Sequence, residues 1–259
     1  MAQMPSPFEQ QKPIDGVDKI VAVSSGKGGV GKSTVSANLA LALSQQGKKV
    51  GLLDADIYGP SIPRMFGCLD QKPEVTADNR IIPIERNGIK IMSIGFLVDE
   101  DAAIVWRGPM LFKAMEQFLR DVQWGELDYL VIDLPPGTGD VQLSLAQKVP
   151  INGAICVSTP QNISLIDVKK AVDMYDRVNI PVIGMIENMA YFRTESGEKL
   201  EMFPRGELDK FLEEKNIPKI AEIPFHKDVA LGAEIGIPVV QSQKNSLEAK
   251  IFGEIASGI

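Results

Sequence analysis

Residues 26–33 of this chain read "GKGGVGKS", which matches the phosphate-binding loop pattern G-x-x-x-x-G-K-[ST]. The apolar run before the loop predicts a strand, and the residues after it predict a helix. Glycines let such a loop turn tightly with its backbone N–H groups facing inward, because a Cβ atom would keep these donors away from a phosphate. The motif therefore constrains the chain to an α/β fold with a triphosphate site between a strand and a helix.

The loop predicts a role for each of its polar side chains. Lys32 is expected to bridge the terminal phosphates of ATP, Ser33 to place its hydroxyl oxygen on Mg²⁺, and Thr34 to contact the α-phosphate. The expected nucleotide-binding residues of the loop are Gly26, Lys27, Gly28, Gly29, Val30, Gly31, Lys32, Ser33 and Thr34. The alternative is an ordinary glycine-rich turn, which the flanking strand and helix disfavour.

Short apolar runs rich in Val and Ile alternate with amphipathic stretches along the rest of the chain. The runs predict buried strands at 19–25, 48–54, 128–133, 153–159, 181–188 and 218–224. The amphipathic stretches predict helices at 32–46, 108–121, 140–148, 162–176, 206–214 and 245–256. Strands that alternate with helices imply right-handed crossovers, so we expect a parallel twisted sheet with helices on both faces.

Two segments depart from this alternation. Residues 80–94 contain the pair Asn87 and Gly88 between apolar runs, which predicts an antiparallel hairpin at one edge of the sheet. Residues 1–18 are polar, rich in proline and without a sustained period, which predicts a flexible N-terminal arm. We therefore expect this arm to precede one ATPase domain over residues 19–259.

Charge and hydropathy limit the partners of the chain. A net charge of -7 and a pI near 4.9 disfavour general binding to nucleic acid or anionic lipid, which both need a basic surface. No run approaches the roughly 20 apolar residues that span a bilayer, and the N-terminus lacks the order of a signal peptide. We expect a cytoplasmic protein in which Cys68 and Cys156 are free thiols, because a lone disulfide is unusual in a reducing compartment.

Carboxylates follow two of the predicted strands, at the edge where an open parallel sheet binds its ligands. Asp133 ends the string "DYLVID" and is expected to hold Mg²⁺ directly or through a water. Asp54 and Asp56 lie at the end of the run 48–54 and just after it. Asp54 is expected to support the metal shell, and the open alternative is that it caps the end of its strand.

The string "KGGVGKST" resembles the deviant Walker A loop of the class that contains MinD, ParA, ArsA and the nitrogenase iron protein. This resemblance implies a homodimer that sandwiches nucleotide, in which Lys27 reaches the phosphates bound to the partner subunit. It also implies that Asp56 orients the attacking water, which needs an acceptor in line with the γ-phosphate. Asn188 would read the adenine edge while Pro224 and Phe225 flank the base, and strand-end packing is the alternative for all three.

Further strings resemble the Mrp/ApbC family of iron-sulfur cluster carrier ATPases over about residues 18 to 245. They are "DADIYGPSIPRMFG", "WRGPM", "DYLVIDLPPGTGD", "VSTPQ" and "IENMAYF". The resemblance implies a Mg²⁺-dependent ATPase with Lys27, Lys32 and Asp56 as catalytic residues, which passes clusters to client apoproteins. "DADIYGPSIP" and "RGPM" identify this family more specifically than the phosphate-binding loop does, because MinD and ParA proteins do not carry them.

The cluster ligands that the resemblance implies are missing. The family has C-x-x-C soon after the "NM-YF" string, because iron-sulfur clusters are held by cysteine. The corresponding positions here are occupied by Arg193, Thr194, Glu195 and Ser196. Cys156 lies inside a predicted core strand, and Cys68 alone would give a dimer only two thiolates. Two hypotheses stay open: an ATPase that carries or assembles clusters, and an ATP-switched scaffold that binds no cluster and recruits a partner.

Overall fold

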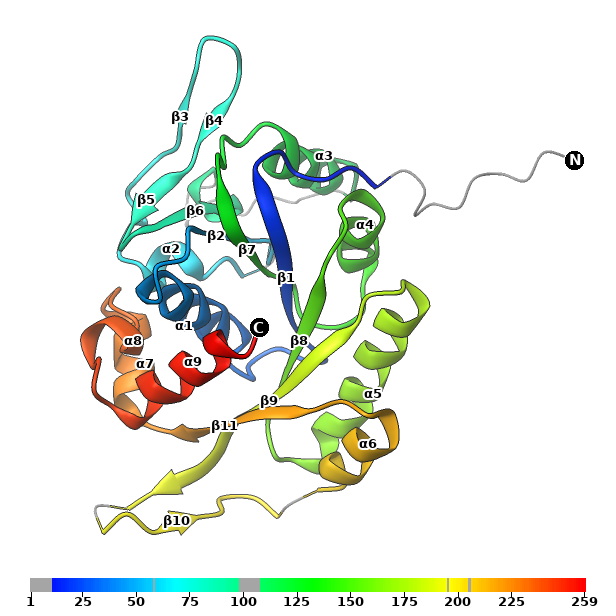
Figure 1. Ribbon diagram of the computed structural model, residues 1–259, viewed down its shortest axis with the longest axis vertical. Helices are drawn as coiled ribbons and strands as arrows, with labels where there is room; N and C mark the ends of the chain where they lie inside the picture. The colour runs from blue at the N-terminus through cyan, green and yellow to red at the C-terminus, as the bar shows by residue number, and fades with distance from the viewer. Residues whose placement is uncertain (1–10, 58, 98–107, 195, 205) are drawn as a thin grey trace, which may run out of the picture.

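The computed structural model describes residues 11–57, 59–97, 108–194, 196–204 and 206–259. A mostly parallel sheet lies at its centre, between two layers of helices (Figure 1). The predicted α/β class with a parallel sheet is therefore confirmed. Of the strings used above, "WRGPM" falls partly on residues 98–107, outside the described residues.

All six predicted strands are present in the main sheet. They are β1 (Val17–Ser25), β2 (Val50–Asp54), β7 (Leu127–Asp133), β8 (Gly153–Ser158), β9 (Val182–Arg193) and β11 (Lys219–Phe225). β1 pairs in parallel with both β7 and β8, so the strand that leads into the phosphate-binding loop lies inside the sheet. Every residue of β2 and β8 is buried, as expected for strands covered on both faces.

The predicted hairpin is present, with one difference in how it joins the sheet. β5 (Ile84–Arg86) pairs antiparallel with β6 (Ile89–Ser93), and the turn between them has φ of 55° at Asn87 and 79° at Gly88. β6, however, runs parallel to β2, so of the two hairpin strands only β5 is an antiparallel addition to the sheet edge. A small second sheet, β3 (Glu74–Val75) with β4 (Ile81–Ile82), and the strand β10 (Lys199–Leu200), antiparallel to β9, were not predicted.

The strand order places the hairpin and β10 at opposite ends of the sheet. The order is β10-β9-β8-β1-β7-β2-β6-β5, with β11 also paired to β9. Because β2, β1 and β7 are neighbours, the carboxyl ends of the strands that carry the loop, Asp54 and Asp133 meet at one edge.

Helices cover both faces of the sheet, as predicted. The expected ones are α1 (Lys32–Gln45), α3 (Gly108–Arg120), α4 (Asp140–Lys148), α5 (Asn162–Arg177), α6 (Leu208–Lys215) and α9 (Leu247–Ser257). The short helices α2 (Ile62–Met65), α7 (Lys227–Glu234) and α8 (Val239–Ser242) were not predicted. Figure 1 shows α1, α8 and α9 on one face and α3, α4 and α5 on the other. None of the helices in the described ranges is both long and apolar enough to cross a membrane.

Part of the segment expected as a flexible arm packs against the domain. The Ile14 side chain is buried, and the Lys12 N–H donates a hydrogen bond to the carbonyl of Lys148. β1 already begins at Val17. Residues 11–18 therefore contact the sheet and its helices, while residues 1–10 lie outside the described residues.

Candidate nucleotide-binding site

The phosphate-binding loop joins the end of β1 to the start of α1, and a side chain from β9 holds it in place. Gly29 and Gly31 have φ of 79° and 82°, in the left-handed region that glycine tolerates best. The Asn188 side-chain amide donates to the Val30 carbonyl at 2.8 Å. A Cβ atom on Gly31 would lie 2.2 Å from Asn188 Nδ2, so glycine is required there for the contact with β9.

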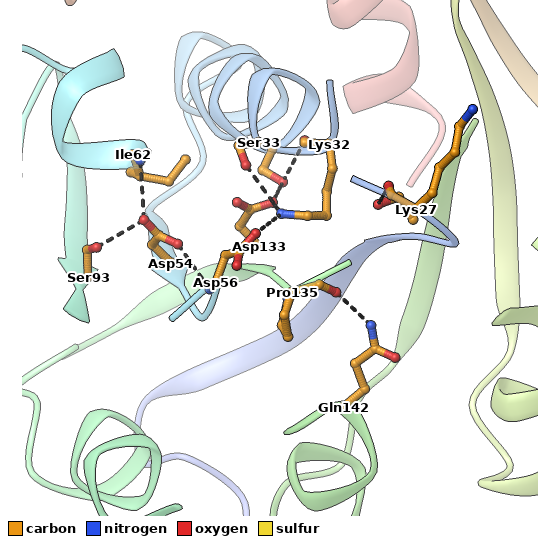
Figure 2. A network of polar contacts seen from close by, with 12 residues as sticks. Lys27, Lys32, Ser33, Asp54, Asp56, Ile62, Ser93, Asp133, Pro135 and Gln142 are labelled. Atoms are coloured by element: carbon orange, nitrogen blue, oxygen red, sulfur yellow. Dashed lines mark hydrogen bonds and ion pairs between the residues drawn. The ribbon is translucent and has the colours of Figure 1, made fainter. Parts of the chain in front are cut away.

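Lys32 lies between two carboxylates at the start of α1 (Figure 2). Its ammonium Nζ is 3.0 Å from Asp133 Oδ1 and 3.4 Å from Asp56 Oδ2, and it also donates to Ser33 Oγ at 3.2 Å. The lysine is 6% exposed. The structure thus brings together four of the predicted site residues, from the start of α1, the end of β7 and the segment after β2, with a buried positive charge where phosphates are expected.

Asp133 has one satisfied and one unsatisfied oxygen. Ser36 Oγ, one turn after Lys32 on α1, donates to Asp133 Oδ1 at 2.7 Å. Asp133 Oδ2 is buried without a hydrogen-bond partner. Lys32 contacts both Asp133 and the Ser33 hydroxyl, so the orphaned oxygen and this hydroxyl belong to one cluster. Such a pair fits Mg²⁺, which prefers oxygen ligands and is often held by one or two protein groups together with phosphates.

Asp54 is fully buried and accepts hydrogen bonds on both oxygens. Its donors are the Asp56 N–H at 3.1 Å, the Ile62 N–H at 3.2 Å and Ser93 Oγ at 2.9 Å. Burial, together with the nearby Asp133 carboxylate, raises the pKa of Asp54 to about 7, and the hydrogen bond from Ser93 opposes this shift. These contacts fit the alternative that Asp54 caps the end of its strand.

Lys27 points away from this cluster. Figure 2 shows its side chain directed away from Lys32 and Asp133, and its Nζ donates to Gln161 Oε1 at 3.3 Å. The preceding Gly26 lies against α5, where a Cβ atom would come 2.4 Å from the backbone of Asp167. The Lys27 ammonium therefore lies on the α5 side of the loop, away from the Lys32 cluster.

The residues expected near the base lie beside the loop on β9 and β11. The parallel register pairs Ile223 with Asn188, so Pro224 and Phe225 follow directly on the strand next to Asn188. Phe225 is 43% exposed and can offer its ring to a ligand. The Asn188 side-chain amide donates to the loop itself, and base recognition by these three residues stays a prediction.

Backbone hydrogen bonds link Thr194 to Gly197 and Glu198 between β9 and β10, next to the positions of the missing cysteine pair. The Thr194 N–H donates to the Glu198 carbonyl, and the Gly197 N–H donates to the Thr194 carbonyl. Both cysteines of the chain are free and buried, at 2% exposure for Cys68 and 1% for Cys156. Within the described residues, no three His, Cys, Asp or Glu side chains are grouped to hold a metal ion.

We expect Gly31→Ala to weaken the binding of Mg-ATP at least about tenfold, because a side chain in the left-handed region costs roughly 1–2 kcal/mol and the methyl group would displace Asn188. Isothermal titration calorimetry measures the affinity. Gly253→Ala in α9 is the matched control, since nothing lies within 4 Å of its Cβ position. Equal affinity of Gly31→Ala and the unchanged protein would contradict the packing of the loop on β9.

Neither cysteine is expected to react with an aromatic disulfide reagent at pH 8 in the native protein. Burial raises the pKa of both the Cys68 and the Cys156 thiol to about 11, which leaves only about one thiol in a thousand ionised at that pH. Two thiols should be titrated after denaturation in guanidinium chloride. Rapid reaction of one thiol in the native state would show that a cysteine is accessible to a metal.

Three polar residues of the site were missed at the level of the sequence. Ser36 bonds Asp133, Ser93 bonds Asp54, and Gln161 bonds Lys27. The position of Ser36 four residues after Lys32 was a usable signal, because i and i+4 share a helix face. Ser93 had no local signal in the sequence, whereas Gln161 ends the string "VSTPQ" that carried part of the family resemblance.

Comparisons with known proteins agree with this geometry. The family model described as ParA, NUBPL iron-transfer P-loop NTPase, matches residues 16–259. The chain is 53% identical over 252 residues to an iron-sulfur cluster carrier protein of Aquifex aeolicus, covering 96% of this chain and 69% of that protein. It is 48% identical to the mouse iron-sulfur cluster transfer protein NUBPL, covering 96% and 79%.

A solved structure with a similar fold contains a bound nucleotide. It is the nucleotide-binding protein of Archaeoglobus fulgidus in complex with ADP, with a TM-score of 0.78, 40% identity and coverage of 95% of both chains. Three findings together identify the family. They are a loop with the phosphate-binding pattern, a lysine between Asp133 and Asp56, and the matches above. The chain belongs to the NUBPL and Mrp/ApbC family of P-loop NTPases, whose relatives are named iron-sulfur cluster carrier and transfer proteins.

Proposed function

We propose that this chain is a Mg²⁺-dependent ATPase that works as a homodimer with nucleotide between its subunits. The observation that carries the proposal is the buried Lys32 ammonium, held between Asp133 and Asp56 at the start of α1. A lysine with two carboxylate partners can turn to a γ-phosphate, with Asp133 then facing magnesium and Asp56 facing the attacking water. Both cysteines are free, which fits the cytoplasm as its compartment.

The site residues divide the work of hydrolysis. Ser33 Oγ and Asp133 would hold Mg²⁺, which when bound supplies charge neutralisation at the phosphate oxygens. Lys32 would neutralise charge on the γ-phosphate, and Asp56 would accept a hydrogen bond from the attacking water. Lys27, directed away from its own site, would reach the nucleotide of the partner subunit and make turnover depend on the dimer.

We further propose that ATP hydrolysis serves iron-sulfur cluster carriage or assembly, as the names of the relatives suggest. The second candidate is an ATP-switched scaffold that binds no cluster. It is favoured by the backbone hydrogen bonds that link Thr194 to Gly197 and Glu198, and by two buried thiols with raised pKa. Both candidates share the same ATPase site and differ only in whether the dimer holds iron and sulfide.

Two measurements test these proposals in turn. Phosphate release from ATP, with and without Mg²⁺, tests the ATPase, and absence of Mg²⁺-dependent turnover would remove it. Anaerobic reconstitution of the full chain with iron and sulfide then tests carriage. Cluster absorbance bands with bound iron and sulfide would support the carrier, whereas no bands with intact turnover would leave the scaffold.

A further inference from the structure

Backbone N–H groups at both ends of the loop between β2 and α2 donate hydrogen bonds to one buried carboxylate, that of Asp54. The Asp56 N–H donates to Asp54 Oδ1, and the Ile62 N–H donates to Asp54 Oδ2. Figure 2 shows both contacts beside the Lys32 cluster. Because the two ends of the loop share one acceptor side chain, the position of Asp56 depends on that side chain.

A third hydrogen bond ties this carboxylate to the neighbouring strand. Ser93 is the last residue of β6, and the parallel register pairs it with Asp54. Its Oγ donates to Asp54 Oδ2 at 2.9 Å and accepts from the Gly95 N–H at 3.0 Å. Asp54 and Ser93 are both 0% exposed, so bulk water does not reach the hydrogen bond between them.

We propose that Asp54 and Ser93 are positioning residues for hydrolysis, which fix Asp56 beside Lys32 and do not ligate magnesium. Asp54 already accepts hydrogen bonds from three protein donors at its roughly four lone-pair sites, and the side chain is fully buried, so little of it remains to face a metal ion. The proposal rests on the ATPase function above, since Asp56 is positioned for a reaction that the ATPase must perform.

The contacts predict a specific kinetic pattern. Ser93→Ala removes one hydrogen bond to a buried carboxylate without touching Lys32, Ser33 or the loop amides. The Asp56 carboxylate should therefore spend less time beside Lys32, where it can accept a hydrogen bond from the attacking water. As a result, kcat should fall about three- to tenfold. The affinity for ATP and the Mg²⁺ concentration for half-maximal activity should stay within about twofold, because the groups that bind both are unchanged.

The test compares Ser93→Ala with the unchanged protein and with Ser44→Ala. Ser44 Oγ donates to the Gly88 carbonyl at the other end of β6, so the control loses a serine hydrogen bond away from the site. The measurements are kcat per nucleotide-binding site, the Mg²⁺ activation constant, and binding of a fluorescent ATP analogue with and without Mg²⁺. Hydrogen exchange of the Ile62 backbone amide should be faster in Ser93→Ala and unchanged in Ser44→Ala.

Asp54→Asn gives the second arm, because its side-chain NH₂ cannot accept the hydrogen bonds now made to one oxygen. Its kcat should fall more than tenfold with an unchanged Mg²⁺ activation constant. A tenfold higher Mg²⁺ requirement in either variant, or wild-type kcat in Ser93→Ala, would overturn the proposal. If the unchanged protein shows no Mg²⁺-dependent turnover, the ATPase function itself has failed, which is a separate result.

Discussion

Lys27→Ala is expected to lower ATP turnover by about 10² to 10³, the loss seen when one donor that stabilises the transition state is removed. ATP should still bind to the monomer, because Lys32, Ser33 and the amides that contact phosphate in the same subunit are unchanged. The Lys27 ammonium contacts Gln161 rather than its own site. Steady-state phosphate release measures the turnover, and calorimetry measures the binding.

One control tests whether the loss of any lysine charge lowers turnover, and one further measurement tests whether the dimer needs Lys27. Lys48→Ala removes an exposed lysine after α1 and should leave turnover unchanged. Light scattering with ATP should show the unchanged protein as a dimer and Lys27→Ala as a monomer, since the lysine would join the two subunits through phosphate. Turnover of Lys27→Ala at the rate of the unchanged protein would exclude the role across subunits.

The fold was largely predictable because its central strands are buried on both faces. Runs such as residues 128–133 have no polar alternation, and they lie between helical stretches long enough to show a 3.6-residue period. Most of the elements that were missed are short, whereas α7 is as long as the predicted helix α6. α2 and α8 have four residues each and β10 has two, so none completes enough turns or alternations to produce a pattern.

The candidate site was predictable to the extent that it follows from strand ends. A parallel sheet brings Asp54, Asp133 and the loop to one edge whatever the side chains between them. What each carboxylate contacts was not predictable. Ser93 is 39 residues from Asp54, and Gln161 is 134 residues from Lys27, so both pairs depend on the strand order and leave no local signal.

Asp56→Asn is expected to stop ATP hydrolysis but, unlike Lys27→Ala, to leave the ATP-bound dimer intact. The amide keeps the shape of the side chain but loses the charge that polarises the attacking water, and general-base catalysis contributes about 10² to 10⁴ in rate. Lys32 keeps its contact with Asp133 at 3.0 Å, so the phosphate-binding lysine stays in place. The measurement is phosphate release, together with light scattering after addition of Mg-ATP.

The ATP-bound dimer of Asp56→Asn should persist after the unchanged protein has hydrolysed its ATP and separated, because removal of a negative charge near the γ-phosphate does not weaken ATP binding. The exposed Asp70 provides the control Asp70→Asn, which should behave as the unchanged protein does. Adding Lys27→Ala to Asp56→Asn should return the protein to a monomer that binds ATP. A double variant that remains dimeric would show that subunit contact does not need Lys27, and an active Asp56→Asn would assign the water to another acceptor.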